Sequence, residues 1–436
     1  MKLITLPFSY FLLLTVVFVS CKKDRPEEII EIPIPEIIEP PTPTPEPTGQ
    51  SLPLFSFAPQ ACTNGMAADY PCENYDLINY ISLTQLGAGM ANDNWGWTDP
   101  ESGKEYVLEG LSNGVAFLDI SSPTQVKFVG KLPTASYESV WRDIKIYQNV
   151  AYVVSEAPDH GLQVFDLTRL RNQAEFQTFE ADYTQEAFGS AHNIAINEAS
   201  GFAYVVGAAK NNTAQFAGGP LFYDLTNPLR PNLVGGYSAS SYTHDAQIVS
   251  YNGPDADHQG KELFLGSNSD GGENNQLVIV DVTDKNNPVL ISETAYGNGG
   301  YTHQGWFDEA QHYFYLGDEL DEIRYGGQTK TLVFDLNDLD APQLHHVYEG
   351  ETSAIDHNGY VKGDRYFLSN YTAGFREIDI SGVPDNAMHE VGYFDTYPEN
   401  DTTGFDGVWN VFPFFESGII AISDSNRGLF LVQRND

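Results

Sequence analysis

The chain has 436 residues, of which 60 are Asp or Glu and 22 are Lys or Arg, and its formal net charge at pH 7 is -38. A field of this sign repels phosphate backbones, which argues against a nucleic-acid partner and leaves cations, basic surfaces and neutral sugars open. The length could hold two or three average domains, but one repeat array that starts near residue 77 accounts for nearly all of it.

The first twenty residues have the layout of an export signal. Lys2 is followed by the apolar run LPFSYFLLLTVVFV, and Ser20 stands directly before Cys21. A Cys at this junction is typical of a bacterial lipoprotein, although Phe18 occupies a position where Leu is preferred. An uncleaved helical anchor is the alternative, but the run barely reaches the length of a membrane span. We therefore expect residues 1–20 to be a signal peptide and Cys21 to carry a lipid that anchors the protein to the bacterial cell envelope, at the outer membrane or the cell surface.

Two short segments precede the repeats. Residues 21–53 are rich in Pro and Glu, and because Pro withholds backbone donors and fixes φ, we expect an extended, unpacked tether. Residues 54–76 contain Cys62 and Cys72, the only cysteines that remain once Cys21 is lipidated. In an exported protein this pair is expected to form a disulfide bond.

Seven repeats follow, each with a polar or aromatic anchor and a short apolar strand that closes on Asp in the first six copies. The anchors recur about every fifty residues, which is a period typical of repeat arrays and propellers. Each repeat contains four strand-like runs separated by turns. The anchors are Trp95, Trp141, His192, His244, His303, His357 and Trp409, and the closing aspartates are Asp119, Asp166, Asp224, Asp281, Asp335 and Asp379. The pattern predicts an all-β, seven-bladed β-propeller over residues 77–436.

The seventh repeat ends at the C-terminus after three strand-like runs, so its fourth strand must come from elsewhere. Residues 77–87, LINYISLTQLG, occupy the place of a last strand without a blade of their own. We expect them to pair beside Leu429–Val432 and to close the ring, because an open array would leave exposed strand edges.

The histidine anchors indicate a candidate site. The first strand of each repeat should line the central channel, so the four histidines should face one another around one mouth. Loops between the second and third strands converge on the same mouth, and the loop GDELDEIRYGG brings several carboxylates there. The candidate ligand or metal residues are His192, His244, His303, His357, Asp245, Asp356, Gln304, Asp318 and Glu319, with Asp321 and Glu322 in the same acidic loop.

The spacing of these residues does not choose a cation. Imidazole with carboxylate suits a divalent transition metal, whereas an oxygen cage suits calcium. In the structural alternative, each His hydrogen-bonds the backbone of the neighbouring blade, and the tryptophans at three equivalent anchors agree with that alternative.

Several longer motifs resemble one known family. CTNGMAADYPCENYDL, NWGWTDPESGKEYVLEGLSNGVAFLDIS, the YTHDAQ and YTHQGW openings and the DELDE loop are similar to the choice-of-anchor B family, and residues 277–281 spell its LVIVD repeat. The similarity runs from about residue 60 to the end. It implies a secreted or surface-attached propeller, and the family implies no established reaction.

Three functions fit these observations. The first is a lipid-anchored binding module that holds a glycan, protein or other ligand at the histidine mouth. The second is a metal-dependent lyase or hydrolase acting on polysaccharide, which would need a cation for the substrate carboxylate from Arg142, Arg324, Arg376 or Arg427. The third is a structural scaffold of an envelope complex.

Overall fold

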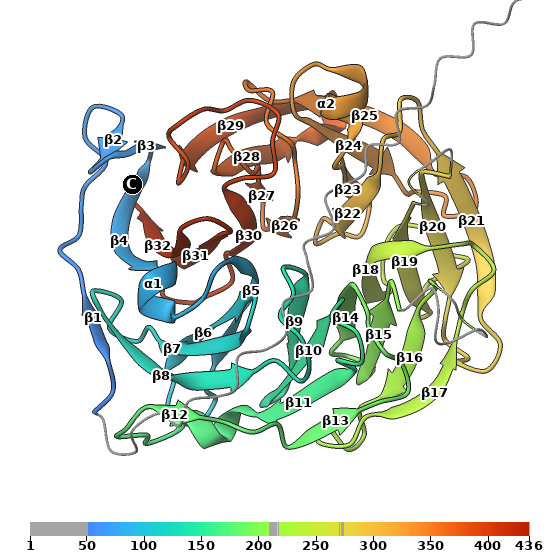
Figure 1. Cartoon of the computed structure of the whole chain (residues 1–436). Coiled ribbons are helices and arrows are strands. Elements are labelled where there is room, and N and C mark those ends of the chain that lie inside the picture. Colours follow the sequence, from blue (N-terminus) through green and yellow to red (C-terminus); the bar gives the residue numbers. More distant parts are fainter. Residues whose placement is uncertain (1–50, 209–215, 217, 270, 272–273, 436) are drawn as a thin grey trace, which may run out of the picture. The chain divides into compact units, whose positions relative to one another are not determined.

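The computed structural model describes residues 51–208, 216, 218–269, 271 and 274–435. They form an all-β propeller with seven antiparallel blades around a central axis (Figure 1), as the repeats predict. No helix in these ranges is long and apolar enough to cross a membrane. The predicted signal peptide 1–20, the lipidation site Cys21 and nearly all of the tether 21–53 lie outside the described residues.

Each blade has four main strands, which follow one another from the channel outward. Blade 1 contains β5 (Ala91–Thr98), β6 (Glu105–Leu111), β7 (Gly114–Asp119) and β8 (Gln125–Pro133), and blade 2 contains β9 (Arg142–Tyr147), β10 (Val150–Ser155), β11 (Leu162–Asp166) and β13 (Tyr183–Gln185). Blade 3 contains β14 (Asn193–Asn197), β15 (Phe202–Val206), β16 (Leu221–Asp224) and β17 (Asn232–Gly236), and blade 4 contains β18 (Thr243–Ser250), β19 (Glu262–Asn268), β20 (Gln276–Asp281) and β21 (Val289–Ala295). Blade 5 contains β22 (Thr302–Phe307), β23 (Tyr313–Asp318), β24 (Lys330–Asp335) and β25 (Gln343–Glu349), and blade 6 contains β26 (Gly359–Lys362), β27 (Arg365–Ser369), β28 (Phe375–Gly382) and β29 (Ala387–Phe394). Blade 7 contains β30 (Val408–Phe412), β31 (Ile419–Asp424), β32 (Gly428–Arg434) and β4 (Tyr75–Ser82).

The hydrophobic core lies between neighbouring blades. Every residue of β6, β7 and β10 is buried, because each of these strands is covered on both faces by an adjacent blade. Between blades 1 and 2, for example, the rings of Phe117 and Phe165 stack with their centroids 4.7 Å apart. Such sheets read as nearly continuous apolar runs, which explains the recurring VAFLD- and LVIVD-like segments.

The closing aspartates have a structural role in the turn after the third strand. The carboxylate of Asp119 accepts hydrogen bonds from the backbone N–H and the hydroxyl of Ser121, at 3.1 and 2.6 Å. Asp224 receives the same pair of bonds from Thr226, and Asp379 receives them from Ser381. These are Asx turns, in which the side chain bonds the backbone two residues ahead and so fixes the path to the outer strand.

Ring closure follows the prediction, with one difference. β4 pairs antiparallel with β32, and the register places Ile81 opposite Leu429 and Leu77 opposite Val432. The expected strand 77–87 ends early, because residues 83–86 form the helix α1 (Leu83–Leu86). Ser82 and Gln85 form a capping box at its start, and Gly87 ends it in the left-handed conformation that Gly adopts without strain.

The lead-in segment 54–76 spans three blades. β1 (Leu54–Ser56) pairs with β8 of blade 1, whereas the hairpin of β2 (Met66–Ala67) and β3 (Tyr70–Glu73) pairs with β29 of blade 6. The predicted disulfide is present between Cys62 and Cys72, whose Cα atoms are 6.0 Å apart. This segment therefore holds the blades on either side of the closing blade 7.

Candidate functional site

The four histidine anchors lie side by side at one mouth of the central channel, in four consecutive blades. His244 and His303 are in the innermost strands β18 and β22. His192 directly precedes β14, and His357 lies two residues before β26. Adjacent imidazole centroids are 4.0, 4.3 and 4.2 Å apart, and adjacent rings are tilted by 43 to 46°. The indole of Trp409 continues the arc, 4.9 Å from the ring of His357.

Backbone carbonyls orient two of these rings, as the structural alternative expects. Nδ1–H of His244 donates to the carbonyl of His303 at 2.9 Å, and Nδ1–H of His357 donates to the carbonyl of Trp409 at 2.5 Å. Since a carbonyl only accepts, Nδ1 carries the hydrogen and Nε2 keeps a lone pair. Metal-bound histidines are held in the same way by their second nitrogen. These two hydrogen bonds to backbone carbonyls are therefore compatible with a structural role of the histidines and with a metal site.

The Glu319 carboxylate faces two of the Nε2 atoms. Its oxygens lie 3.9 Å from Nε2 of His303 and 3.8 Å from Nε2 of His357. One of these oxygens accepts a hydrogen bond from the Tyr371 hydroxyl at 2.9 Å, which fixes the carboxylate. The distances to the imidazoles are too long for hydrogen bonds. His303, Glu319 and His357 thus surround a small gap with three ligand atoms.

Burial keeps most of this arc uncharged. It lowers the pKa of His357 to about 3, and burial together with the neighbouring imidazoles moves the pKa of His244 and His303 well below the ordinary value. Burial also raises the pKa of Glu319 to about 7. Although burial disfavours the imidazolium of His192, the 2.7 Å hydrogen bond with Glu156 and the negative charges of Glu156, Asp245 and Glu319 together outweigh it and raise the pKa of this histidine. Neutral imidazoles are the form that binds metal.

A small cavity borders the four imidazoles, and Glu319 is not among the residues that line it. Its volume of about 20 Å³ has room for an ion or a water molecule and not for a sugar ring. The cavity is lined by Asp93, Trp141, Arg142, Asp143, His192, Asn193, His244, His303, His357, Asn358 and Trp409. A larger ligand would have to rest on the rim above the histidines. There the half-buried rings of Tyr242 and Tyr301 share a side-chain hydrogen bond, and Tyr301 packs edge-on against His244 with 5.1 Å between centroids.

Other predicted site residues have different surroundings. Asp318 accepts hydrogen bonds from Tyr296, Gly300, Tyr301 and Leu320, so both of its oxygens hold the loop before β22. Gln304 accepts a 3.0 Å bond from the backbone of Gly359 and links blades 5 and 6. Asp356 is fully buried and groups with Asp321 and Glu322 of α2 (Asp321–Tyr325), and not with Glu319 and the histidines.

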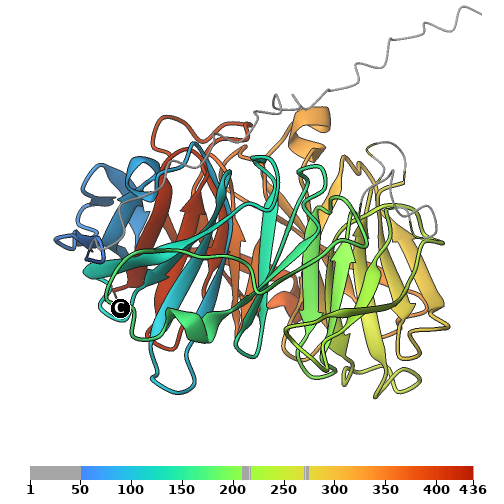
Figure 2. The same cartoon turned by 60° about the horizontal axis from the view of Figure 1, so that its bottom comes forward.

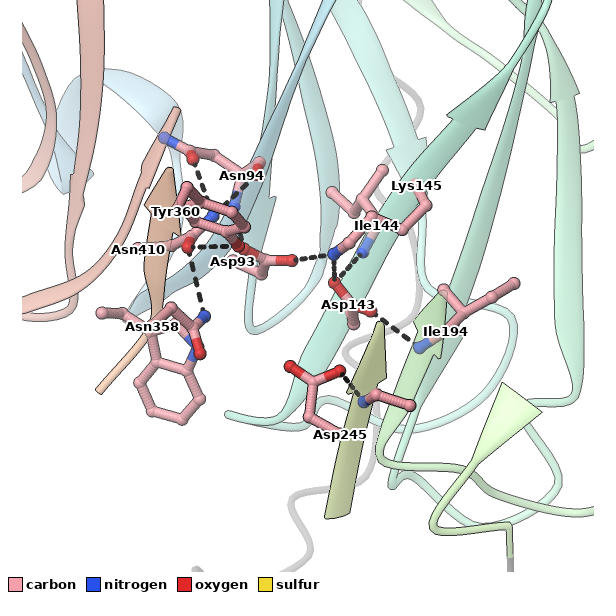
Figure 3. A network of polar contacts seen from close by, with 12 residues as sticks. Asp93, Asn94, Asp143, Ile144, Lys145, Ile194, Asp245, Asn358, Tyr360 and Asn410 are labelled. Atoms are coloured by element: carbon pink, nitrogen blue, oxygen red, sulfur yellow. Dashed lines mark hydrogen bonds and ion pairs between the residues drawn. The ribbon is translucent and has the colours of Figure 1, made fainter. Parts of the chain in front are cut away.

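Deeper in the channel wall lies a charged network that the sequence pattern did not predict (Figure 3). Lys145 of β9 is bonded to Asp93 of β5 at 3.1 Å and to Asp143 at 2.5 Å. Asp245 of β18 approaches the same lysine, and burial raises the pKa of this carboxyl to about 7. Lys145 two residues after Asp143, in the largely buried strand RDIKIY, is the signal that could have pointed to this network.

The four arginines near the mouth are engaged in contacts within the protein. Arg142 donates to the carbonyl of Leu111 and to Thr134, and it contacts His160 at 2.9 Å. The remaining three are bound to protein oxygens: Arg324 to Gly271, Arg376 to Ala373 and Glu390, and Arg427 to Glu399. Arg142 and Arg376 are buried and Arg427 is half-buried, so Arg324 is the exposed one of the four.

The comparisons with known proteins show the fold alone. No family model and no curated protein matches the chain. Among solved structures, the crystal structure of the WD40 β-propeller domain of Doa1 superposes with a TM-score of 0.52 at 11% identity, covering 83% of this chain and 95% of that one. A protein from Lactobacillus plantarum gives a TM-score of 0.47 at 14% identity, covering 76% of this chain and 88% of that one. At this identity the similarity to the WD40 propeller domain shows the propeller fold alone.

Proposed function

We propose that this protein is an exported binding module that holds a divalent transition-metal ion at His303, His357 and Glu319 and receives a ligand on the rim above it. The observation that carries the proposal is the spacing of Nε2 of both histidines from the Glu319 carboxylate, 3.8 and 3.9 Å. Two ligands of one tetrahedral zinc ion, each about 2.1 Å from the metal, are about 3.4 Å apart. The two distances exceed this value by about 0.5 Å, and one ligand atom from each of the three residues lies within 4.8 Å of the others, so the three groups would have to move closer together to bind an ion.

The remaining coordination position would face the rim. Catalytic and binding metal sites with three protein ligands keep a fourth position for water or a ligand atom. The ligand would contact the metal through one oxygen and lie against the rings of Tyr242 and Tyr301, of which Tyr301 packs against His244. Rings of this kind stack on sugars and pack against peptide side chains. A glycan or a protein segment is therefore the proposed ligand class.

The proposal includes the family and the anchor that the sequence motifs imply. The LVIVD segment at residues 277–281 forms most of β20, and it supports membership of the choice-of-anchor B family. The lipid on Cys21 and the tether 21–53 would hold the propeller away from the outer membrane or the cell surface. Arg376 and Arg427 are paired with carboxylates and Arg142 is buried, which leaves Arg324 of these four for a substrate carboxylate and favours binding over a polysaccharide lyase.

Metal analysis tests the proposal. The full chain, without a His tag, is purified in detergent and dialysed without chelator, and its metals are measured by plasma mass spectrometry. We expect about one transition-metal ion per chain, which is lost in His303→Ala/His357→Ala and retained in His346→Ala, a histidine on the outer strand β25. Absence of metal from the wild type, or equal loss in both variants, would leave the imidazole arc as a hydrogen-bonded structural element.

A further inference from the structure

We propose that a hard divalent cation, calcium in the first place, binds between blades 5 and 6 at Asp321, Glu322 and Asp356. This site is separate from the histidine site and does not depend on it. Asp321 and Glu322 begin α2, the short helix that stands at the rim of blade 5 (Figure 2), and Asp356 comes from the segment that enters blade 6. The cation would therefore connect two neighbouring blades.

The three carboxylates form a compact, buried group. Asp321 is 6% exposed, Glu322 is 3% exposed and Asp356 is 0% exposed. One oxygen from each lies within 4.8 Å of the others. Two oxygens on opposite sides of a calcium ion, at 2.3–2.6 Å each, would be roughly 4.6–5.2 Å apart, so the group has the dimensions of a calcium site.

The carboxylate oxygens of this group lack partners. Both oxygens of Asp356, both oxygens of Glu322 and one oxygen of Asp321 accept no hydrogen bond from the residues that the structure describes. Buried polar atoms in native proteins nearly always have a partner in the protein, in water or in an ion. Five orphaned oxygens in one place therefore point to a ligand that supplies positive charge.

A second acidic cluster shows the contrast. Asp255, His258 and Asp340 also lie within metal-binding distance of one another. There, however, Asp255 accepts from the backbone of Asp257 and of Leu339, and His258 bonds Asp340 at 2.9 Å. Hydrogen bonds already satisfy that cluster, so it carries no comparable indication of a cation.

The charges around the three carboxylates match a divalent ion. Nζ of Lys330 bonds Asp321 at 3.0 Å, and it is the positive charge nearest to the group in the described contacts. Buried carboxylates beside a single ammonium are stable either when protons neutralise them or when a cation does, and a divalent ion would neutralise the charge of about -2 that three ionised carboxylates and Lys330 leave. Oxygen-only ligands favour Ca²⁺ or Mg²⁺ over the softer metals that imidazole attracts.

The fold makes room for the Asp356 carboxylate at a glycine. A Cβ atom added to Gly317 of β23 would lie 2.5 Å from Oδ2 of Asp356. Asp356 therefore reaches across the blade interface to the backbone of β23, just before the loop that carries Asp321 and Glu322. Any side chain at residue 317 would push this carboxylate out of the group.

Calcium binding to the full chain in detergent tests the inference. The wild type is stripped with chelator and titrated with CaCl₂ by isothermal titration calorimetry, and its melting temperature is recorded with and without Ca²⁺. We expect one Ca²⁺ per chain and a rise in melting temperature of about 3 °C at a free Ca²⁺ concentration a hundredfold above Kd. Asp356→Asn and Glu322→Gln should each lose the heat signal and the shift.

Matched variants distinguish this site from the histidine site and from the second acidic cluster. Asp340→Asn, in the saturated cluster, should bind Ca²⁺ as the wild type does, and so should His303→Ala/His357→Ala. Circular dichroism confirms that each variant keeps its β structure. A wild type that binds no Ca²⁺, or an Asp356→Asn protein that keeps both responses, would overturn the inference. Loss of Ca²⁺ binding in the His303→Ala/His357→Ala variant would overturn its independence from the histidine site.

Discussion

Mutations in the N-terminal segment should show that it docks as one unit. Leu77 of β4 is fully buried in the core between blades 6 and 7, and Leu77→Ala should lower the free energy of unfolding by about 3 kcal/mol. The disulfide links residues 10 positions apart, and loop entropy assigns it about 3 kcal/mol. A cross-link stabilises the fold only while the loop that it closes is ordered. If Leu77→Ala lets the segment leave the ring, the disulfide loses its effect, and the combined loss should fall at least 1 kcal/mol short of the sum of about 6 kcal/mol.

A double-mutant cycle in urea, followed by tryptophan fluorescence, measures this coupling. The cycle combines Leu77→Ala with Cys62→Ser/Cys72→Ser. The control is a second cycle in which Leu132→Ala takes the place of Leu77→Ala. Leu132 is a buried leucine in β8, which is the corresponding strand of blade 1. Leu132→Ala should add to the loss of the disulfide within about 0.5 kcal/mol. Strict additivity in both cycles would mean that the lead-in segment and β4 hold the ring independently, and our reasoning on closure would be wrong.

Three further predictions concern single side chains. Lys145→Met should lower the free energy of unfolding, measured in urea, by roughly 3–5 kcal/mol, because it leaves the buried carboxylates of Asp93 and Asp143 without their cation. Lys104→Met breaks an ion pair with Asp119 in which the lysine is exposed, and it should lower the same free energy by less than about 1 kcal/mol. Burial alone would raise the pKa of Asp99, but hydrogen bonds from Arg171 and Ser102 outweigh it and lower the pKa to about 2, so this group's contribution is complete above about pH 4 and is lost as the pH falls towards 2. The urea midpoint of Asp99→Asn should accordingly change less than that of the wild type between pH 4 and pH 2, and parallel curves would contradict the assignment. Cys21→Ala should abolish incorporation of labelled palmitate, and a variant that still incorporates the label would exclude Cys21 as the lipidation site.

The repeat pattern predicted the architecture because propeller blades are local units. The closing aspartates recur because each forms the same Asx turn, and the missing fourth strand of the last repeat identified β4 as the closing strand. The histidine arc was predictable for a related reason, since equivalent positions in successive blades must be neighbours around the axis.

The carboxylates were harder to assign because loops set their directions. Asp318 and Glu319 are adjacent and looked equivalent as ligands, yet Asp318 turns back to accept four hydrogen bonds and Glu319 faces the histidines. That difference depends on the turn into α2. This helix has no side-chain cap at its start, so the sequence contains no capping residue from which the turn could be predicted. Likewise, the approach of Asp356 to Gly317 joins two blades and has no counterpart in the other repeats that a period could reveal.

Because β4 supplies the last strand of blade 7, it also determines when the ring of blades can close during folding. The side chain of Asn435 donates to Asp76 across 359 residues of sequence, so the last blade joins the earliest and latest parts of the chain. Bringing such distant ends together costs about 5 kcal/mol in loop entropy before the contact returns anything. For a chain that crosses a membrane from its N-terminus, β4 arrives first and must wait for β32, while six blades form behind it. If the chain is exported in this direction, ring closure is a late folding event, and until then the apolar faces of blades 1 and 6 that blade 7 covers are exposed to chaperones or aggregation.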